Sequence, residues 1–319
     1  MKKITIILLA TLLVFTGCGK KQATIQEGQG ETGSDKKTIY TSVYPVYDFT
    51  KKIVGDKFNV ELIVPVGQEP HDYELDTNVL KGMENADIFV YNGAGLESFA
   101  DKIIGAIDNK DLVAVEASRG VDLIKADNHE DEDHDHEEEE EEHHHGAYDP
   151  HTWLDPENAI IEMENIKNAV VEIDPDNGDF YEENFNTYKA KLEELDKKYQ
   201  EELKDYKGGK IVVSHEAFGY LCRRYGLEQL GISGINAEGE PDAKTMAEIV
   251  DFVKENNIKV IFTEELLDTK VSDTIAAETG AKTLVLNPIE GLSQEELDSG
   301  EDYISVMEKN LSNLLEAFK

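Results

Sequence analysis

The sequence predicts an α/β protein with two lobes, each built on a mostly parallel sheet flanked by helices. Apolar, β-rich runs alternate with helical segments over residues 38–175, and the same alternation resumes over residues 208–319. Such alternation is typical of parallel sheets with helices on both faces. One long amphipathic helix, within residues 176–207, separates the two halves. We therefore expect this helix to join the lobes, and a ligand to bind in the cleft between them.

The first lobe, residues 38–175, contains four runs with strand character, at 39–43, 59–67, 87–95 and 111–118. The spacing of apolar residues predicts helices at 47–54, 75–86, 99–107 and 158–171. Pro45 is expected to separate the first strand from the helix that follows. Asp155 and Pro156 suit the N-cap and the first turn of the last helix.

The linking segment, residues 176–207, has the clearest helical pattern in the chain. Its apolar residues recur at steps of three or four: Tyr181, Phe185, Tyr188, Leu192, Leu195, Tyr199, Leu203 and Tyr206. This spacing places them on one face of a helix roughly 45 Å long, and Gly208 and Gly209 should end it. We interpret the stripe as packing against both lobes, and a coiled-coil dimer is the alternative.

The second lobe, residues 208–319, repeats the α/β theme. Strands are predicted at 210–218, 259–265 and 282–291. Helices are predicted at 218–225, 243–256, 271–279 and 304–318, and Gly280 should end the third of these. The strand at 210–218 contains a histidine near its end, and the strand at 282–291 ends close to a glutamate.

The N-terminal sequence MKKITIILLATLLVFTGCGKK has the proportions of a signal peptide over residues 1–17. Its ending, FTGC, resembles a bacterial lipobox, although Phe15 departs from the usual Leu or Val. We expect cleavage before Cys18 and lipidation of that cysteine; an ordinary secretory signal with an incidental cysteine is the alternative. Residues 18–37 are polar and predict a flexible tether. Acyl chains would then hold the protein on the outer face of the cell membrane.

The composition excludes some classes of function. The formal net charge is −37, and so acidic a surface repels nucleic acid. Cys18 and Cys222 are the only cysteines. If Cys18 is acylated, Cys222 has no intrachain partner, and we expect it to be a small buried apolar residue.

A dense acidic tract interrupts the first lobe, and residues 127–147 are expected to form a disordered loop. Tracts rich in histidine can bind metal, so this loop is a candidate for weak metal collection near the cleft. The alternative is a solvated charged insert that collects no metal. The histidines of the tract are His129, His134, His136, His143, His144 and His145.

Three other histidines stand apart from this tract: His71 in EPHDYE, His151 in DPHTWL and His215 in VVSHEAF. Each lies where a loop or a strand end can direct a side chain into a cleft. Imidazole is a favoured ligand of zinc and related divalent metals. From the residues alone, these histidines fit either one metal site or three unrelated structural contacts.

Several stretches carry a resemblance to a known family: SVYPVYDFTKKIVGD, VPVGQEPHDYE, ENADIFVYNGAGLESF, DPHTWLDPENA, SHEAFGYLCRRYGL, GINAEGEPDAKTMAEI, VIFTEE and LNPIEGL. From about residue 37 onward the chain resembles the metal-specific solute-binding proteins, in particular the zinc-binding lipoproteins of bacterial ABC importers. The resemblance implies a monomeric carrier that delivers Zn²⁺ to a membrane permease, whose cytoplasmic ATPase drives import.

The resemblance also implies a set of ligands. His71, His151 and His215 match the metal-binding histidines of the family motifs, and Glu290 in NPIEG matches a fourth ligand. Water takes that fourth place in some zinc-specific members, and Glu69 and Glu265 are rival carboxylates.

Three imidazoles with at most one carboxylate suit Zn²⁺ better than Mn²⁺, which prefers oxygen. Binding should weaken below about pH 6 as the imidazoles protonate. A manganese-binding relative and a surface zinc buffer or adhesin are the alternatives. An exported zinc hydrolase is disfavoured, because Gly219 stands where an HExxH motif would place its second histidine.

Partners for the imidazoles should lie nearby, because metal-binding histidines usually donate their second ring N–H. Asp72, Asp155 and Glu216 are the candidates adjacent in sequence. Trp153 and Phe218 are expected to pack around the cleft and exclude water.

Overall fold

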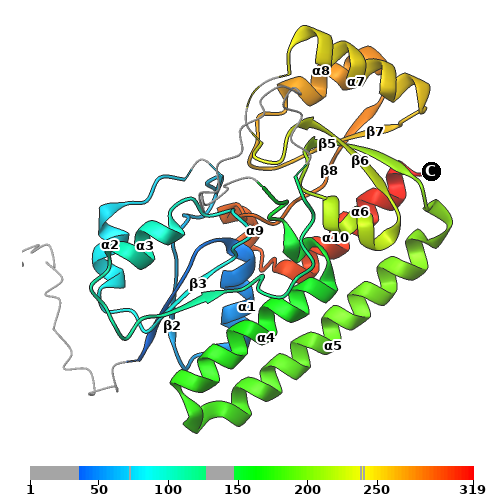
Figure 1. Ribbon diagram of the computed structural model, residues 1–319. Coiled ribbons are helices and arrows are strands. Elements are labelled where there is room, and N and C mark those ends of the chain that lie inside the picture. Colours follow the sequence, from blue (N-terminus) through cyan, green and yellow to red (C-terminus); the bar gives the residue numbers. More distant parts are fainter. Residues whose placement is uncertain (1–35, 72, 127–146, 238, 240) are drawn as a thin grey trace, which may run out of the picture. The chain divides into compact units, whose positions relative to one another are not determined.

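The structure is a computed structural model that describes residues 36–319, except residues 72, 127–146, 238 and 240 (Figure 1). The predicted signal peptide, Cys18, nearly all of the predicted tether and the six histidines of the acidic tract therefore lie outside the described residues. Cys222 is described and is buried, as predicted.

The first lobe is built on a four-stranded parallel sheet with the strand order β2-β1-β3-β4. The buried Ile39 in the inner strand pairs with Val60 on one side and Ile88 on the other. The strands are β1 (Thr38–Thr41), β2 (Asn59–Leu62), β3 (Ile88–Tyr91) and β4 (Val113–Glu116). The helices are α1 (Tyr44–Val54), α2 (Thr77–Met83), α3 (Ala100–Ala106) and α4 (Pro156–Ile173).

Helix α1 begins earlier than predicted. Pro45 lies in its first turn instead of between a strand and a helix. Proline is tolerated there because the first N–H groups of a helix have no partner within the helix. In α4, Asp155 and Pro156 take the expected positions, and the Asp155 side chain accepts a hydrogen bond from the Glu157 N–H.

The second lobe has a parallel sheet with the order β6-β5-β7-β8. Its strands are β5 (Lys210–His215), β6 (Glu228–Ser233), β7 (Val260–Thr263) and β8 (Lys282–Val285). Its helices are α6 (Gly219–Tyr225), α7 (Ala243–Glu255), α8 (Lys270–Thr279), α9 (Gln294–Asp298) and α10 (Tyr303–Ala317). Strand β6 and the short α9 were not predicted. Gly231 interrupts the apolar pattern of β6, which weakens its strand signal.

Helix α5 (Gly178–Leu203) is the long linking helix. Its predicted stripe is buried from Tyr181 to Leu203 and faces α1, α4, α6 and α10 of the same chain. Tyr188 donates a hydrogen bond to Asp48 of α1 (3.1 Å), and Tyr199 donates one to the Met307 carbonyl of α10 (2.6 Å). The intramolecular interpretation of the stripe is therefore confirmed, and the face is not free for a coiled coil.

The two sheets share one strand order, in which the first strand of each lies between the second and the third. Ligands of open parallel sheets bind beyond the carboxyl ends of the strands. His215 is the last residue of β5, while His71 and Glu290 lie in the loops after β2 and β8. The candidate ligands therefore come from the edges of the sheets where ligands are expected.

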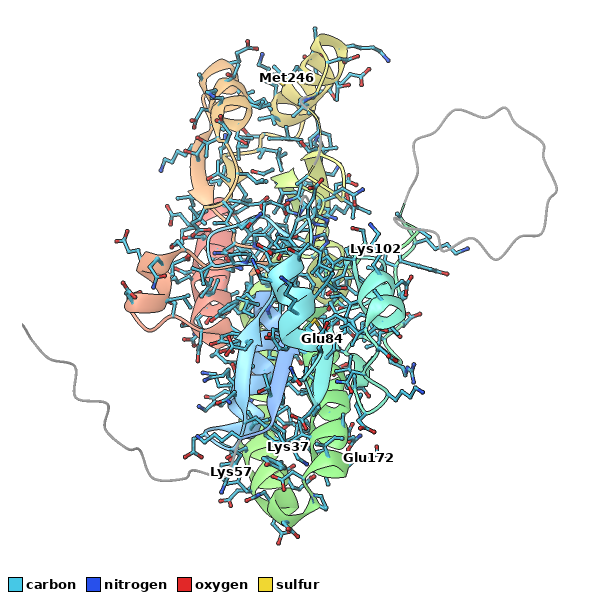
Figure 2. The ribbon with its side chains drawn as sticks, turned by 90° about the vertical axis from the view of Figure 1, so that its left-hand side faces the viewer. Lys37, Lys57, Glu84, Lys102, Glu172 and Met246 are labelled. Atoms are coloured by element: carbon cyan, nitrogen blue, oxygen red, sulfur yellow. The ribbon has the colours of Figure 1, made fainter. Side chains whose placement is uncertain are left out.

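The outer surface is strongly charged. Figure 2 shows side chains such as Lys57, Glu84 and Lys102 projecting away from the ribbon, and all three are exposed. Within the described part of the chain, no helix combines the length and apolar character needed to cross a bilayer.

Candidate metal centre

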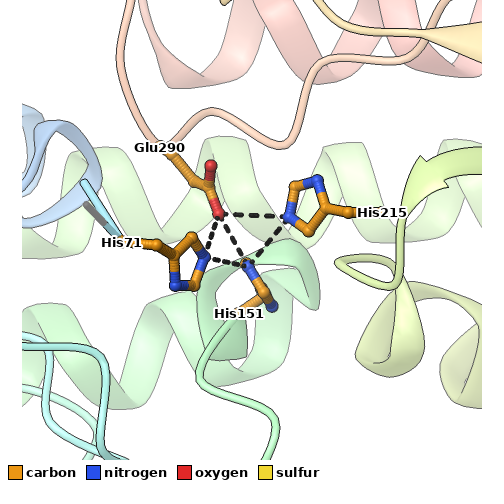
Figure 3. Close-up of side chains that lie close together, drawn as sticks. All are labelled: His71, His151, His215 and Glu290. Atoms are coloured by element: carbon orange, nitrogen blue, oxygen red, sulfur yellow. Dashed lines mark hydrogen bonds and ion pairs between the residues drawn. The ribbon is translucent and has the colours of Figure 1, made fainter. Parts of the chain in front are cut away.

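Four side chains that are far apart in the sequence meet in the structure (Figure 3). One ligand atom from each of His71, His151, His215 and Glu290 lies within 4.8 Å of all the others. The structure thus brings together the three histidines and the carboxylate that the sequence singles out. The fold, and not closeness in the sequence, brings these residues together, since His71 and Glu290 are 219 positions apart.

Three of the separations between these atoms match a small tetrahedral site. His151 Nε2 lies 3.3 Å from Nε2 of both His71 and His215, and His215 Nε2 lies 3.4 Å from Glu290 Oε1. A tetrahedral ion with bonds of about 2.0–2.1 Å holds its ligand atoms roughly 3.3–3.4 Å apart. Glu290 Oε1 is closer to His71 (3.0 Å) and His151 (2.7 Å), so the carboxylate would have to move outward slightly to admit an ion of this kind.

His151, like His215, is 0% exposed. It stands between Pro150 and the short 3-10 helix η1 (Thr152–Leu154), where the chain turns toward α4. Asp149 Oδ1 accepts hydrogen bonds from the His151 backbone N–H (3.0 Å) and from Nδ1 (2.8 Å). A carboxylate only accepts, so Nδ1 carries its proton and Nε2 faces the other ligands.

His215 ends the buried strand β5, and its imidazole is also supported by a carboxylate. Glu264 directly follows β7, the neighbouring strand, and its Oε1 lies 2.9 Å from His215 Nδ1. The carboxyl ends of adjacent parallel strands meet at one edge of a sheet, which brings these two side chains together.

His71 reaches the centre from the loop between β2 and α2, after Pro70. Its side chain is 5% exposed. Its ring packs against those of His151 and His215, with centroids 5.4 and 5.9 Å away. His71 thus completes the cluster from a loop, whereas His215 stands on a strand.

The loop that carries Glu290 is held by several contacts. Ile289 has φ = 62°, a strained conformation for a β-branched residue. Asn287 Oδ1 accepts the Ile289 N–H (2.7 Å), and the Trp153 indole N–H donates to the Pro288 carbonyl (2.7 Å). The backbone N–H of Tyr44, from α1, donates to the Glu290 carbonyl (3.3 Å). Contacts from both lobes therefore set the direction of the carboxylate.

Electrostatics at the centre favour an ionised carboxylate surrounded by imidazoles. Burial alone would raise the pKa of Glu290, but the charges of His215 and His71 and hydrogen bonds from His151 and His215 hold it well below its ordinary value. Burial alone would lower the pKa of His151, but hydrogen bonds to Asp149 and Glu290 raise it. The pKa of His215 is raised likewise, against its burial, by Glu264 and Glu290.

Two sequence expectations about the surroundings need correction. The partner of His151 is Asp149 and that of His215 is Glu264. Asp155 instead caps α4, and Glu216 lies against Gly231 of β6. Asp72 lies outside the described residues. The pattern Asp-Pro-His could have indicated Asp149, since Asp often accepts the N–H two residues on.

The other side chains named from the sequence have defined positions in the structure. The rival carboxylates Glu69 and Glu265 line a cavity of about 10 Å³ beside Glu290, and neither belongs to the four-atom group. Trp153 and Phe218 are fully buried, and the Trp153 ring lies 5.5 Å from that of His151. Their exclusion of water from the cleft stays a prediction.

Comparison with known proteins places the chain in a family. Residues 39–317 match the family model described as zinc-uptake complex component A, periplasmic (ZnuA). The match covers nearly all of the two lobes. The chain belongs to this family.

Relatives within and around the ZnuA family agree with this assignment. The chain is 42% identical over 308 residues to the high-affinity zinc uptake system protein ZnuA of Bacillus subtilis, covering 97% of this chain and 95% of the relative. It is 40% identical over 316 residues to the zinc-binding lipoprotein AdcA of Streptococcus pneumoniae, covering 98% of this chain but only 60% of AdcA.

Solved structures support the same fold. The Zn(II)-bound ZnuA-like domain of Streptococcus pneumoniae AdcA superposes with a TM-score of 0.74 at 38% identity, covering 88% of this chain and 98% of that domain. The predicted architecture of two α/β lobes joined by a long helix is therefore confirmed.

Proposed function

We propose that this protein is the extracytoplasmic zinc-binding component of an ABC importer, and that it captures Zn²⁺ between His71, His151, His215 and Glu290. The single observation that carries the proposal is the preformed cluster of one carboxylate oxygen and three imidazole nitrogens with near-tetrahedral spacing. The family and its zinc-binding relatives support the same assignment. Such components carry a solute and are not enzymes.

The donor set favours zinc over manganese. Three of its four atoms are nitrogen, and Mn²⁺ prefers oxygen ligands in an octahedral arrangement. Four donors this close to one another suit a four-coordinate ion of zinc's size. Zn²⁺ is the cargo here, and the neutral imidazoles and the Glu290 carboxylate would replace its water shell.

The setting of this capture is also part of the proposal. Residues 1–17 would be removed at export, Cys18 would be lipidated, and residues 18–37 would tether the two lobes, 38–175 and 208–319, to the cell membrane. Helix 176–207 would keep the lobes at a nearly fixed distance. The loaded protein, a monomer, would dock on a membrane permease driven by an ATPase, and loop 127–147 would gather zinc weakly through its histidines.

Metal titration of the purified mature protein tests the proposal. We expect one tightly bound zinc per chain, lost in His71→Ala, His151→Ala and His215→Ala, each by more than about 100-fold in affinity. Deletion of residues 129–145 is the matched control and should leave that tight equivalent in place. Manganese binding as tight as zinc binding would contradict the assignment.

A further inference from the structure

Asp149 is held between the two lobes. Its backbone N–H donates to the Ile124 carbonyl (2.9 Å) in the first lobe, while its own carbonyl accepts the Tyr220 hydroxyl (2.8 Å) of α6 in the second. The residue is only 2% exposed. These contacts fix the backbone of Asp149, so its carboxylate has little freedom to move away from His151.

The two carboxylate oxygens of Asp149 face different partners. Oδ1 binds the backbone N–H and the Nδ1 of His151. Oδ2 lies against Gly219, the first residue of α6, where a Cβ atom would come within 2.4 Å of it. No side chain larger than hydrogen fits there unless the carboxylate shifts.

We propose that Asp149 is a positioning residue for the metal centre, and that Gly219 is required to leave space for its carboxylate. The inference rests on the proposed zinc site. Asp149 fixes the ring of His151 with Nε2 toward the ion, and His151 Nε2 is the atom within 3.3 Å of the other three ligand atoms. A shift of this one ring therefore alters the spacing of the whole site.

Glu264 gives His215 an equivalent support from β7. Carboxylates that orient a metal-binding imidazole typically contribute 10–100-fold to metal affinity. Asp149 differs from Glu264 in its dependence on a glycine of the other lobe. Replacing Gly219 should therefore displace the carboxylate of Asp149 and, through it, the ring of His151.

Substitutions at Asp149 separate its two roles. The amide oxygen of Asp149→Asn can still accept the His151 N–H, so the turn is retained while the charge facing Nδ1 is lost. We expect roughly tenfold weaker zinc binding in Asp149→Asn and up to roughly 100-fold in Asp149→Ala. Asp155→Asn is the matched control, since it neutralises another buried aspartate nearby that contacts no imidazole.

Gly219→Ala tests the space beside the carboxylate, with Gly105→Ala as control because a Cβ at Gly105 meets nothing within 4 Å. We expect Gly219→Ala to weaken zinc binding roughly tenfold. It should also change the visible absorption of the cobalt-substituted protein, which reports ligand geometry. A merely structural role would lower the melting temperature of the metal-free protein and leave that spectrum unchanged.

The measurements are zinc affinity by chelator competition, the cobalt spectrum and the melting temperature, on the mature protein. Wild-type affinity and spectrum in Asp149→Asn would overturn the inference, even if Gly219→Ala failed to fold. If wild type itself bound no zinc, the proposed function would fail first, which is a distinguishable result.

Discussion

Two buried glutamates of this protein lie in opposite electrostatic surroundings. Glu290 and Glu162 are 4% and 0% exposed. Three imidazoles surround Glu290, and its pKa is held well below the ordinary value. Burial raises the pKa of Glu162, on α4, to about 8, although a hydrogen bond from Thr152 acts in the opposite direction. Burial without a cationic neighbour thus favours a neutral carboxyl group, while cationic neighbours keep a buried one ionised.

The difference bears directly on which carboxylate can hold a cation. The charges of Glu97 and Asp155 add to burial in raising the pKa of Glu162, so near pH 7 it is largely a neutral acid. Glu290 is ionised under the same conditions and presents its negative charge to the centre. Of the two glutamates, only Glu290 therefore has the charge that the proposed metal ligand requires.

Removing the charge of Glu290 should have the largest effect. In Glu290→Gln we expect roughly 100-fold weaker zinc binding, since a hydrogen-bonded charged group contributes up to about 3 kcal/mol. Isothermal titration or chelator competition would measure it. Glu265→Gln, which alters the same small cavity outside the four-atom group, should bind zinc as wild type does. Equal losses in both variants would show that general acidity, not the ligand position, sets affinity.

Replacing Glu162 should be favourable instead of harmful, and it should change the stability of the fold instead of zinc affinity. We expect Glu162→Gln to raise the free energy of unfolding at pH 7 by about 2 kcal/mol, because the Glu162 carboxyl must take up a proton on folding at this pH and the neutral amide carries no such cost. Zinc affinity should not change.

The pH dependence follows from the direction of the shift. The folded pKa of about 8 exceeds the ordinary 4.5, so the contribution of Glu162 is full below about pH 4.5 and declines as the pH rises toward 8. The gap between variant and wild type should therefore widen over this range, by at most about 1.4 kcal/mol per pH unit. A gap that stayed constant from pH 5 to 8 would rule out a neutral Glu162.

Replacing an exposed carboxylate should have the smallest effect of these substitutions. Glu248 on α7 pairs with Lys244 at 3.3 Å, and their side chains are 64% and 84% exposed. Solvent screens such a pair, so Glu248→Gln should change the free energy of unfolding by less than about 0.5 kcal/mol. Equilibrium denaturation at low and at high salt would measure this change. A change above about 1 kcal/mol at either salt concentration would contradict the prediction.

Much of the fold could be predicted because its signals are local. The stripe of α5 and the apolar strands follow from periodicity, and Gly280 ends α8 in the left-handed conformation as expected. Strand β6 has no comparable signal. The support of His215 by Glu264 depends on β5 and β7 being neighbours, and this strand order cannot be read from spacing.

The candidate site also has parts that the sequence predicts and parts that it does not. The histidines and Glu290 were singled out by motifs, and their role as ligands stays a prediction. The strained backbone at Ile289 opposes the preference of its residue type, so no sequence pattern could have indicated it. In the sequence, Gly219 mattered only because it stands where an HExxH motif would have its second histidine. In the structure, it leaves space beside the carboxylate of Asp149.

The wide separation of the ligands along the chain has a consequence for the order of folding. His71 contacts Glu290 across 219 positions, and Tyr303 of α10 donates a hydrogen bond to the Trp153 carbonyl across 150 (2.5 Å). Contacts of such range close late, because long loops must lose their entropy first. A chain that leaves the cell N-terminus first would display single imidazoles until its final helices arrive. The ion would therefore meet either isolated weak ligands or the finished centre, and metal loading would mark the completion of folding.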